Sequence, residues 1–174
     1  EVFKLENLTK SLIQLSRLET NMIRLEPVYE SLKKTLQGAV SSVYMKAYRK
    51  NIAISVSEFE DENVLQDPRW TQEALVNILD NAVKYSAPNT AVEIRVEPMV
   101  SYYLIEIEDQ GIGIPKEERN QIFKRFYRGR SSAVQETDGS GVGLYLTRKI
   151  LEEQGGSICV KSGRKGCIFQ ITYP

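Results

Sequence analysis

Apolar residues recur at every third or fourth position near the start of the chain, from Lys4 to about Leu25. The residues near heptad a and d positions are Leu5, Leu8, Leu12, Leu15 and Met22. This pattern predicts an amphipathic helix that packs against another helix of the same or a second chain. A helix folded onto its own domain is the alternative, because the heptad pattern is short. Pro27 ends the segment, so we divide the chain into residues 1–26 and a domain at residues 27–174.

Beyond this boundary the apolar period changes repeatedly between that of a helix and that of a strand. The predicted helices are Val28–Tyr48, Pro68–Tyr85 and Val142–Gln154. The predicted strands are Asn51–Ser57, Ala91–Glu97, Tyr102–Glu108, Ser157–Ser162 and Cys167–Tyr173, and the last four form two hairpins. A polar connector at 129–141 is the expected mobile loop. These elements predict an α/β fold in which helices pack on one face of a mixed sheet, and they argue against a doubly wound fold.

Composition excludes several kinds of chemistry. The 174 residues hold 23 basic and 23 acidic side chains, which argues against a general nucleic-acid or membrane-surface binder. There is no histidine, so an ordinary zinc site and a histidine-dependent catalytic pair are both excluded. Cys159 and Cys167 are expected on paired strands of the last hairpin, as reduced, buried thiols rather than as a disulfide. No apolar run is long enough to span a membrane and Glu1 begins no signal peptide, so we expect a piece of a larger protein.

The helix predicted at Pro68–Tyr85 carries a polar stripe beside its apolar face. At about 100° per residue, Asn77, Asn81 and Lys84 fall within an arc of roughly 60°. Asn is a mediocre helix former, because its side chain competes for backbone hydrogen bonds. Two amides and a cation could hold a hydrated Mg²⁺ and phosphate oxygens. Taken alone, the stripe favours the alternative of a solvated helix face.

Two glycine-rich turns carry a second set of candidate residues. Asp109 directly follows a predicted strand, and Gly111 and Gly113 let the backbone approach a ligand closely. A carboxylate suits an exocyclic amine such as that of adenine, although an ordinary Asp-Gln-Gly turn is the alternative. The second turn, "GSGVGL", opens a helix whose free N–H groups attract anions. It is neither a Walker loop nor the dinucleotide fingerprint, because it lacks both the Gly-Lys-Ser/Thr and the preceding strand.

Between these turns, the segment "IFKRFYRG" interleaves aromatic and basic residues. We expect the aromatic residues to anchor the segment while one cation reaches a phosphate. A charge-flanked surface helix is the alternative. The aromatic residues are Phe123, Phe126 and Tyr127, and the cations are Lys124, Arg125 and Arg128.

Taken in order, these segments resemble the ATP-binding catalytic domain of sensor histidine kinases, in the gyrase–chaperone–MutL ATPase superfamily. The segment "NILDNAVKYS" looks like the N box of that family and "DQGIGIP" like its first glycine box. "IFKRFYRG" looks like its F box and "GSGVGLYLTRKI" like its second glycine box. The match covers about Val28 to Pro174, with order and spacing intact. It implies a two-layer α/β sandwich that binds ATP between the Asn helix and a flexible lid at about 129–140.

The resemblance also implies a role for each matching residue. Asp109 would read the adenine amine above Gly113, Asn81 would bind Mg²⁺, and Arg128 would reach the γ-phosphate. The implied catalytic residues are Asn77, Lys84 and Arg128. The implied ATP-binding residues are Asn77, Asn81, Lys84, Tyr85, Asp109, Gly111, Gly113, Ile114, Gly139, Ser140, Gly141, Val142, Gly143 and Leu144. Two departures from the family are Tyr145 in place of a small residue and Cys167 where Thr is frequent.

The implied activity is phosphoryl transfer from MgATP to a histidine of a dimerisation and phosphoacceptor domain, and then to a response regulator. The segment "LSRLE" resembles the end of the second helix of such a dimerisation domain. The resemblance further implies a homodimer in the full-length protein and a cytoplasmic domain of a membrane-anchored sensor kinase. Without a histidine, this chain cannot phosphorylate itself.

Three alternative functions stay open. ATP hydrolases of the gyrase or chaperone type carry a Glu one turn before the Mg²⁺ ligand, where this chain has Asn77, an amide without useful basicity. An anti-sigma-factor serine kinase would share the nucleotide site, but the heptad helix favours the sensor kinase. A non-catalytic interaction domain would bind nucleotide weakly or not at all, and the intact boxes argue against it.

Overall fold

The computed structural model describes residues 6, 9, 12, 13, 16 and 25–174. Most of the helix predicted at 4–25 lies outside the described residues, and its five described interior positions are helical. The predicted division into 1–26 and 27–174 therefore stays a prediction. None of the helices in the described part of the chain is long and apolar enough to cross a membrane.

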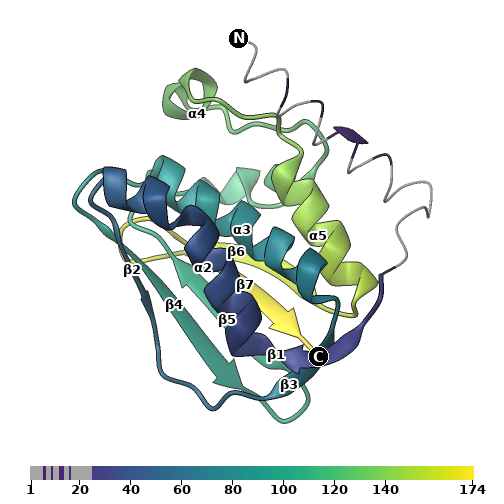
Figure 1. Cartoon of the computed structure of the whole chain (residues 1–174). Helices are drawn as coiled ribbons and strands as arrows, with labels where there is room; N and C mark the ends of the chain where they lie inside the picture. The colour runs from purple at the N-terminus through teal and green to yellow at the C-terminus, as the bar shows by residue number, and fades with distance from the viewer. Residues whose placement is uncertain (1–5, 7–8, 10–11, 14–15, 17–24) are drawn as a thin grey trace.

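Two layers make up the domain (Figure 1). One layer holds three helices, α2 (Leu32–Arg49), α3 (Pro68–Tyr85) and α5 (Gly143–Glu153). The other is a mixed sheet with the strand order β2 (Ala53–Val56), β4 (Ala91–Pro98), β5 (Tyr103–Glu108), β7 (Cys167–Tyr173) and β6 (Ser157–Ser162). β2 runs parallel to β4, whereas the other neighbouring strands are antiparallel. The predicted α/β fold, with helices on one face of a mixed sheet, is confirmed.

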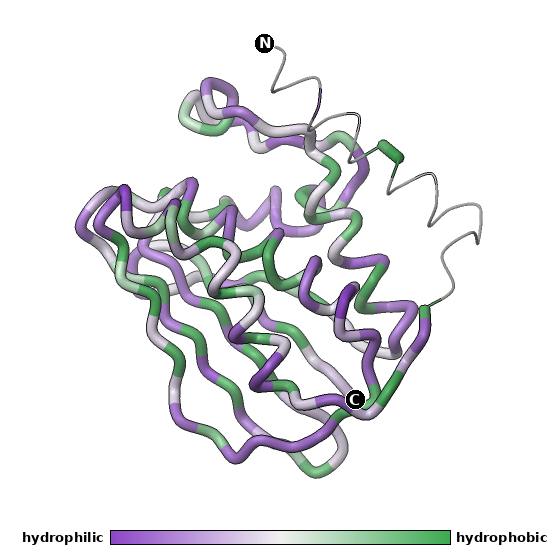
Figure 2. The backbone as a smooth tube through the Cα atoms, viewed as in Figure 1, coloured by the Kyte–Doolittle hydropathy of each residue, from purple (hydrophilic) through white to green (hydrophobic). Residues whose placement is uncertain are grey.

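Alternation along the strands decides which face of the sheet meets the helices (Figure 2). In β4, Val92, Ile94 and Val96 are buried, whereas Glu93 and Arg95 between them point to the other face. The helices complete the core with one apolar face each. The core face predicted for α3 is confirmed, since the following residues are each at most 2% exposed: Leu75, Ile78, Leu79, Ala82 and Val83. This packing fixes the rotation of α3 and so sets the direction of its polar stripe.

Local signals set the start of α3. The Asp67 carboxylate accepts hydrogen bonds from the backbone N–H groups of Arg69 (3.1 Å) and Trp70 (3.2 Å). These two N–H groups have no partner inside the helix, so the cap supplies one. Pro68 occupies the first helical position, where its missing N–H costs nothing. The predicted bounds of α3 are confirmed.

One predicted helix began too early, and two strands were not predicted. Val28–Ser31 forms strand β1, which pairs antiparallel with β3 (Asn63–Gln66) in a separate two-stranded sheet. Helix α2 starts only at Leu32, because the Ser31 hydroxyl accepts the N–H of Lys34 (2.9 Å) as a cap. The prediction of helix at Val28–Ser31 was therefore wrong.

Two further predictions need correction. The connector at 129–141 was predicted as a loop, but it contains a short helix, α4 (Ser132–Glu136), which Figure 1 places apart from the two layers. The Ser131 hydroxyl caps this helix at the N–H of Val134, which no apolar period could indicate. Cys167 is a buried free thiol, as predicted, whereas Cys159 is free but exposed. Cys159 stands opposite Gln170 on the face of the sheet that the helices leave open.

Candidate functional site

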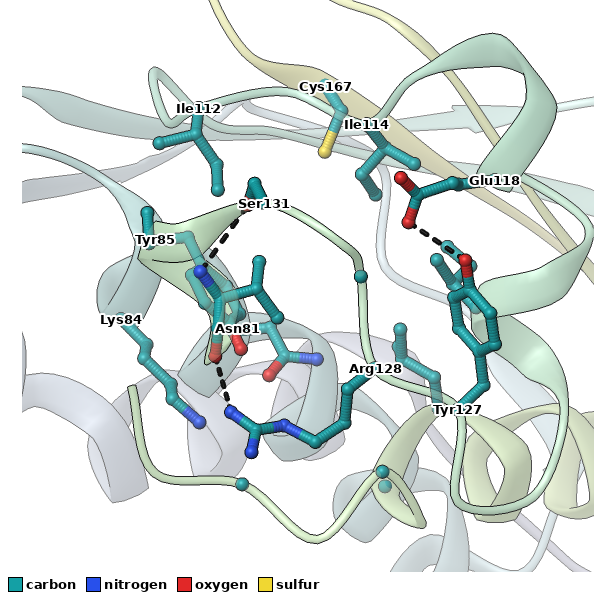
Figure 3. Close-up of a pocket in the computed structure, with 18 of the residues that line it drawn as sticks. Asn81, Lys84, Tyr85, Ile112, Ile114, Glu118, Tyr127, Arg128, Ser131 and Cys167 are labelled. Atoms are coloured by element: carbon teal, nitrogen blue, oxygen red, sulfur yellow. Dashed lines mark hydrogen bonds between the residues drawn. The ribbon is translucent and has the colours of Figure 1, made fainter. Parts of the chain in front are cut away.

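A cavity of about 880 Å³ lies between α3, the loop after β5, residues 127–141 and the start of α5 (Figure 3). The site residues predicted from the sequence that line it are Asn77, Asn81, Lys84, Tyr85, Asp109, Gly113, Ile114, Arg128, Gly139, Ser140, Gly141, Gly143 and Leu144. Residues from four separate segments of the chain therefore surround one space. Two predicted residues do not line it. Val142 is fully buried, and Gly111 lies behind the wall, where a Cβ would be 2.8 Å from the Tyr85 carbonyl oxygen.

A buried carboxylate forms one end of the cavity. Asp109 is only 5% exposed, and its Oδ1 accepts the backbone N–H groups of Gly111 (2.9 Å) and Cys167 (3.2 Å). The Cys167 thiol donates to Oδ2 at 3.1 Å. These donors come from the turn after β5 and from the first residue of β7, which lie side by side in the sheet. A carboxylate held by several donors is fixed in direction and can still accept a hydrogen bond from a ligand.

The surroundings of this carboxylate are shaped by the lack of a side chain at Gly166. A Cβ on Gly166 would overlap Asp109 Oδ1, so the β6–β7 turn can pack against the carboxylate only with glycine there. Burial, reinforced by the negative charge of Asp109, raises the pKa of the Cys167 thiol. The thiol therefore stays protonated and acts as a hydrogen-bond donor.

The other end of the cavity is cationic and rich in amides. Asn81 and Lys84 project from α3 into the space, and Figure 3 shows both side chains on the same wall as Tyr85. Asn77, one turn earlier, donates a long hydrogen bond of 3.4 Å to the Gly143 carbonyl oxygen, which joins α3 to the first turn of α5. Burial lowers the pKa of Lys84, whose ammonium group donates to the Asp138 carbonyl oxygen.

Arg128 faces this end from the opposite side. Its guanidinium group donates to the carbonyl oxygens of Val134 and Thr137, at the end of α4. Cations at the C-terminal end of a helix satisfy carbonyl groups that have no partner within the helix. Arg128 and Lys84 thus both contact the backbone of the 129–141 segment and both line the cavity. Lys84 and Arg128 therefore bring two cations to the end of the cavity away from Asp109, although the carboxylates of Asp80 and Asp138 lie near Lys84.

The free end of α5 adds a third anion-attracting feature. No side chain caps this helix, and its first residues, Gly143 and Leu144, lie on the cavity wall. The uncapped N–H groups and the helix dipole together favour a negatively charged ligand. The cavity is therefore suited to a ligand with an amine at one end and phosphates at the other.

One aromatic anchor was predicted wrongly, and one carboxylate was missed. Phe126 is 53% exposed and has a positive φ of 61°, so it does not anchor its segment as expected. Glu118, which lines the cavity, is only 7% exposed and accepts the Tyr127 hydroxyl (2.9 Å) and the Arg130 N–H (3.1 Å). Nothing in the sequence around Glu118 indicates burial, because both partners lie further along the chain.

The apolar part of the wall was also missed. These residues are Ile112, Ile122, Val134 and Phe169, and they come from four different segments. The sequence did not indicate that these residues line a cavity, because an apolar residue in a strand or turn is predicted to belong to the core. Of these, Ile112 follows Asp109 by three residues and Phe169 follows Cys167 by two, so both give the carboxylate end a hydrophobic lining that suits a flat ring.

Comparison with known proteins identifies the family of this chain. A family described as histidine kinase-, DNA gyrase B- and HSP90-like ATPases matches residues 66–174. The chain belongs to this family. It is thus an ATP-binding domain, and the resemblance to the catalytic domain of sensor histidine kinases is confirmed.

Individual relatives agree with this assignment. The signal transduction histidine-protein kinase ArlS of Staphylococcus aureus (strain USA300) is 28% identical over 99% of this chain and 38% of its own length. The mycobacterial sensor histidine kinase MprB is 28% identical, with a TM-score of 0.72 over 84% of this chain and 97% of that structure. The histidine kinase ThkA in complex with the response regulator TrrA has a TM-score of 0.78 at 22% identity, covering 100% of this chain and 48% of that one. The chain spans well under half of the length of ArlS.

Proposed function

We propose that the chain binds MgATP and transfers the γ-phosphoryl group to a histidine on a helical phosphoacceptor domain. The observation that carries this proposal is the cavity itself, with a fixed carboxylate at one end and two cations, two amides and an uncapped helix at the other. Adenine would lie against Asp109 and the apolar wall. The triphosphate would extend toward Lys84, Arg128 and the first turn of α5.

The residues of this chain would act by position and charge. Phosphoryl transfer requires little covalent chemistry from the protein, and most of the catalysis comes from alignment and from neutralising phosphate oxygens. Lys84 and Arg128 would exchange their bonds to the lid backbone for bonds to phosphate. The bond from the γ-phosphorus to the β-phosphate oxygen would break as a bond to the imidazole nitrogen forms, and ADP would leave. Any base would come from the acceptor domain.

The residues present fit a metal ion that the nucleotide helps to bind. Among the described residues, no group of three or more acidic or cysteine side chains could hold a metal alone. A hydrated Mg²⁺ needs only one or two protein oxygens when phosphates supply the others. The amide oxygen of Asn81, on the cavity wall, is the proposed ligand. When bound, the ion would neutralise charge on the phosphate oxygens.

Hydrolysis of ATP is the second candidate, and the residue one turn before Asn81 disfavours it. Gyrase- and chaperone-like hydrolases use a Glu there to activate water, as the resemblance implies, but this chain has Asn77. The Asn77 amide is bonded to the start of α5. An amide does not take a proton from water at neutral pH. We therefore favour transfer to a partner over hydrolysis.

The length of one relative and the partner of another support the proposed partners. ArlS is longer than this chain, and the ThkA complex contains a response regulator. For this chain we propose a histidine-bearing dimerisation domain of which residues 1–26 form the C-terminal part. We also propose a homodimer in the full-length protein and a response regulator as phosphoryl acceptor. We also propose that the domain lies on the cytoplasmic side of a membrane-anchored kinase.

Labelled ATP tests the proposal directly. Incubated with γ-labelled ATP, the chain alone should carry no stable label, because it has no histidine. An added helical phosphoacceptor domain should become labelled, and the same domain with its histidine replaced should not. Release of labelled phosphate by the chain alone, with no labelled acceptor, would instead support hydrolysis.

A matched pair of variants tests the assignment of Asp109 to the base. Asp109→Asn keeps the shape of the side chain but adds a donor toward the amine, so ADP affinity should fall about tenfold or more. Glu117→Gln, an exposed neighbour eight residues along, should leave it unchanged. Equal calorimetric affinities for the two variants would contradict the assignment of Asp109 to the base.

A further inference from the structure

Glu118 is a carboxylate in the cavity wall that the proposed function leaves without a role. Its side chain is 7% exposed and lines the cavity. It belongs to the short helix η1 (Lys116–Glu118), beyond the turn that carries Asp109. A buried carboxylate is costly unless hydrogen-bond donors compensate its charge, so the donors around Glu118 decide what it can bind.

The two oxygens of this carboxylate differ in their donors. Oε2 accepts the Tyr127 hydroxyl (2.9 Å) and the Arg130 backbone N–H (3.1 Å). Gly129 packs against the same oxygen, since a Cβ there would lie 3.3 Å from it. Oε1, in contrast, accepts no hydrogen bond from the described residues. One oxygen is thus bound to the start of the lid, and the other has capacity left for a ligand.

This second oxygen can be reached from the cavity. Among the described residues, the polar side-chain atoms that are both sealed from solvent and unpartnered are Gln66 Oε1 and Ser86 Oγ. Glu118 Oε1 is not one of them, so it is accessible, and the space beside Glu118 is the cavity. Figure 3 shows the oxygen without a dashed line on the side of Ile114, turned away from Tyr127. A ligand in the cavity can therefore donate a hydrogen bond to Oε1.

The chemistry of ATP limits which of its groups this oxygen can bind. An ionised carboxylate accepts hydrogen bonds and donates none, so its partner must carry an N–H or O–H group. At neutral pH the donors of ATP are its exocyclic amine and the two hydroxyls of its sugar. The amine is assigned to Asp109 in the proposed function, and the phosphates would be repelled by a second carboxylate. The sugar hydroxyls are the donors that remain.

We propose that Glu118 is a specificity-determining residue for the sugar of the nucleotide, and that a sugar hydroxyl donates a hydrogen bond to its Oε1. This role rests on the proposed function, because it requires the base at Asp109 and the phosphates at Lys84 and Arg128. Tyr127 and Arg130 already hold the carboxylate in one direction, so the contact requires little further ordering of the side chain. The chain should therefore bind ribonucleotides more tightly than deoxyribonucleotides.

Calorimetric titration with ADP, 2′-deoxy-ADP and 3′-deoxy-ADP tests the role in the natural chain. At least one of the two deoxynucleotides should bind about tenfold more weakly than ADP, because a hydrogen bond to a charged group is lost. The measurement needs no variant, so it does not depend on whether a substitution disturbs folding. Equal affinities for the three nucleotides would overturn the inference.

Three variants test whether Glu118 is the source of the discrimination. In Glu118→Gln the one remaining oxygen is needed by the Arg130 N–H, so deoxy-ADP and ADP should bind within about threefold of each other. Tyr127→Phe removes a donor to Oε2 and leaves Oε1 in place, so it should weaken all three nucleotides alike and keep their ratio. Glu117→Gln, at an exposed position outside the cavity wall, is the matched control and should change no dissociation constant.

The possible results separate this role from the proposed function. If Glu118→Gln weakens ADP and the deoxynucleotides equally, so that their ratio is kept, the residue only holds the start of the lid and the inference is overturned. If the natural chain binds ADP but does not discriminate against either deoxynucleotide, the role of Glu118 fails and the proposed function stands. If the natural chain binds none of the three nucleotides, the proposed function fails and this role fails with it.

Discussion

The ammonium group of Lys50 donates a hydrogen bond to the Ser86 carbonyl oxygen across 2.7 Å. The same group reaches the carbonyl oxygens of Val83 (2.8 Å) and Lys84 (3.0 Å). Lys50 directly follows α2, and its three acceptors end α3, where carbonyl groups lack partners within the helix. A cation at this end also interacts favourably with the helix dipole. The contact fixes the turn of α3 that carries Lys84 and Tyr85 into the cavity.

Loss of this cation should destabilise the domain. Lys50→Met leaves three partly buried carbonyl groups without their donor, so the free energy of unfolding should fall by about 1–3 kcal/mol. Urea denaturation measures the change. Lys34→Met is the control, since Lys34 makes only an exposed pair with Glu30, four residues earlier, and should cost far less. Similar losses in the two variants would show that the three bonds contribute little.

Elements with strong local signals could be predicted from the sequence. Helix α3 has a cap, a proline in its first turn and a continuous apolar face, and its bounds were predicted correctly. The same apolar period placed Asn77, Asn81 and Lys84 on one flank, and all three line the cavity. Strands β1 (VYES) and β3 (NVLQ) could not be predicted, because their apolar residues are adjacent and do not alternate with polar ones.

Contacts between distant segments could not be predicted in the same way. Asp109 and Cys167 are 58 positions apart, and only the pairing of β5 with β7 brings them together. The burial of Glu118 likewise depends on the Tyr127 hydroxyl, which no local pattern contains. That the site residues surround one cavity was predicted from the resemblance to a family, because a family resemblance carries tertiary information that periodicity lacks.

Asn81 should control the response to Mg²⁺. As the proposed ligand of the ion, its amide oxygen matters only when the ion is present. We expect Mg²⁺ to strengthen ATP binding in the natural chain and to have little effect in Asn81→Ala, as measured by calorimetry with and without the ion. Asn120→Ala, at an exposed position outside the cavity, is the control. A full Mg²⁺ effect in Asn81→Ala would remove this residue from the proposed metal site.

Glu108 should make the free energy of unfolding depend on pH. The Arg164 N–H (3.0 Å) and the Arg95 guanidinium (3.0 Å) hold the pKa of this carboxyl below its usual range. Because the folded-state pKa is lowered, the stabilisation is fully present above the usual value of 4.5 and is lost as pH falls through the lowered pKa. At neutral pH, Glu108→Gln should lower the free energy of unfolding by about 1–3 kcal/mol.

The difference between the natural chain and Glu108→Gln should shrink as the solution is made more acidic than about pH 4.5. Urea denaturation at several pH values measures it. Glu97→Gln, at an exposed position of β4, is the control and should show a small difference at every pH. A difference for Glu108→Gln that stays constant down to low pH would mean that the carboxylate charge does not contribute.

Gly141 should tolerate no side chain, because the two ends of the lid cross there. Its φ is +70°, and a Cβ would lie 2.7 Å from the Phe126 carbonyl carbon and 2.8 Å from the Tyr127 carbonyl oxygen. Both contacts are with backbone, so Gly141→Ala must displace the segment or strain it by about 1–3 kcal/mol. Gly38→Ala is the control, since Gly38 lies in α2 outside the cavity and a Cβ there would first meet the flexible amide end of Gln72. Nucleotide affinity, measured by calorimetry, should fall markedly for Gly141→Ala and little for Gly38→Ala. If both variants bind alike, the backbone crossing at Gly141 does not set the geometry of the lid.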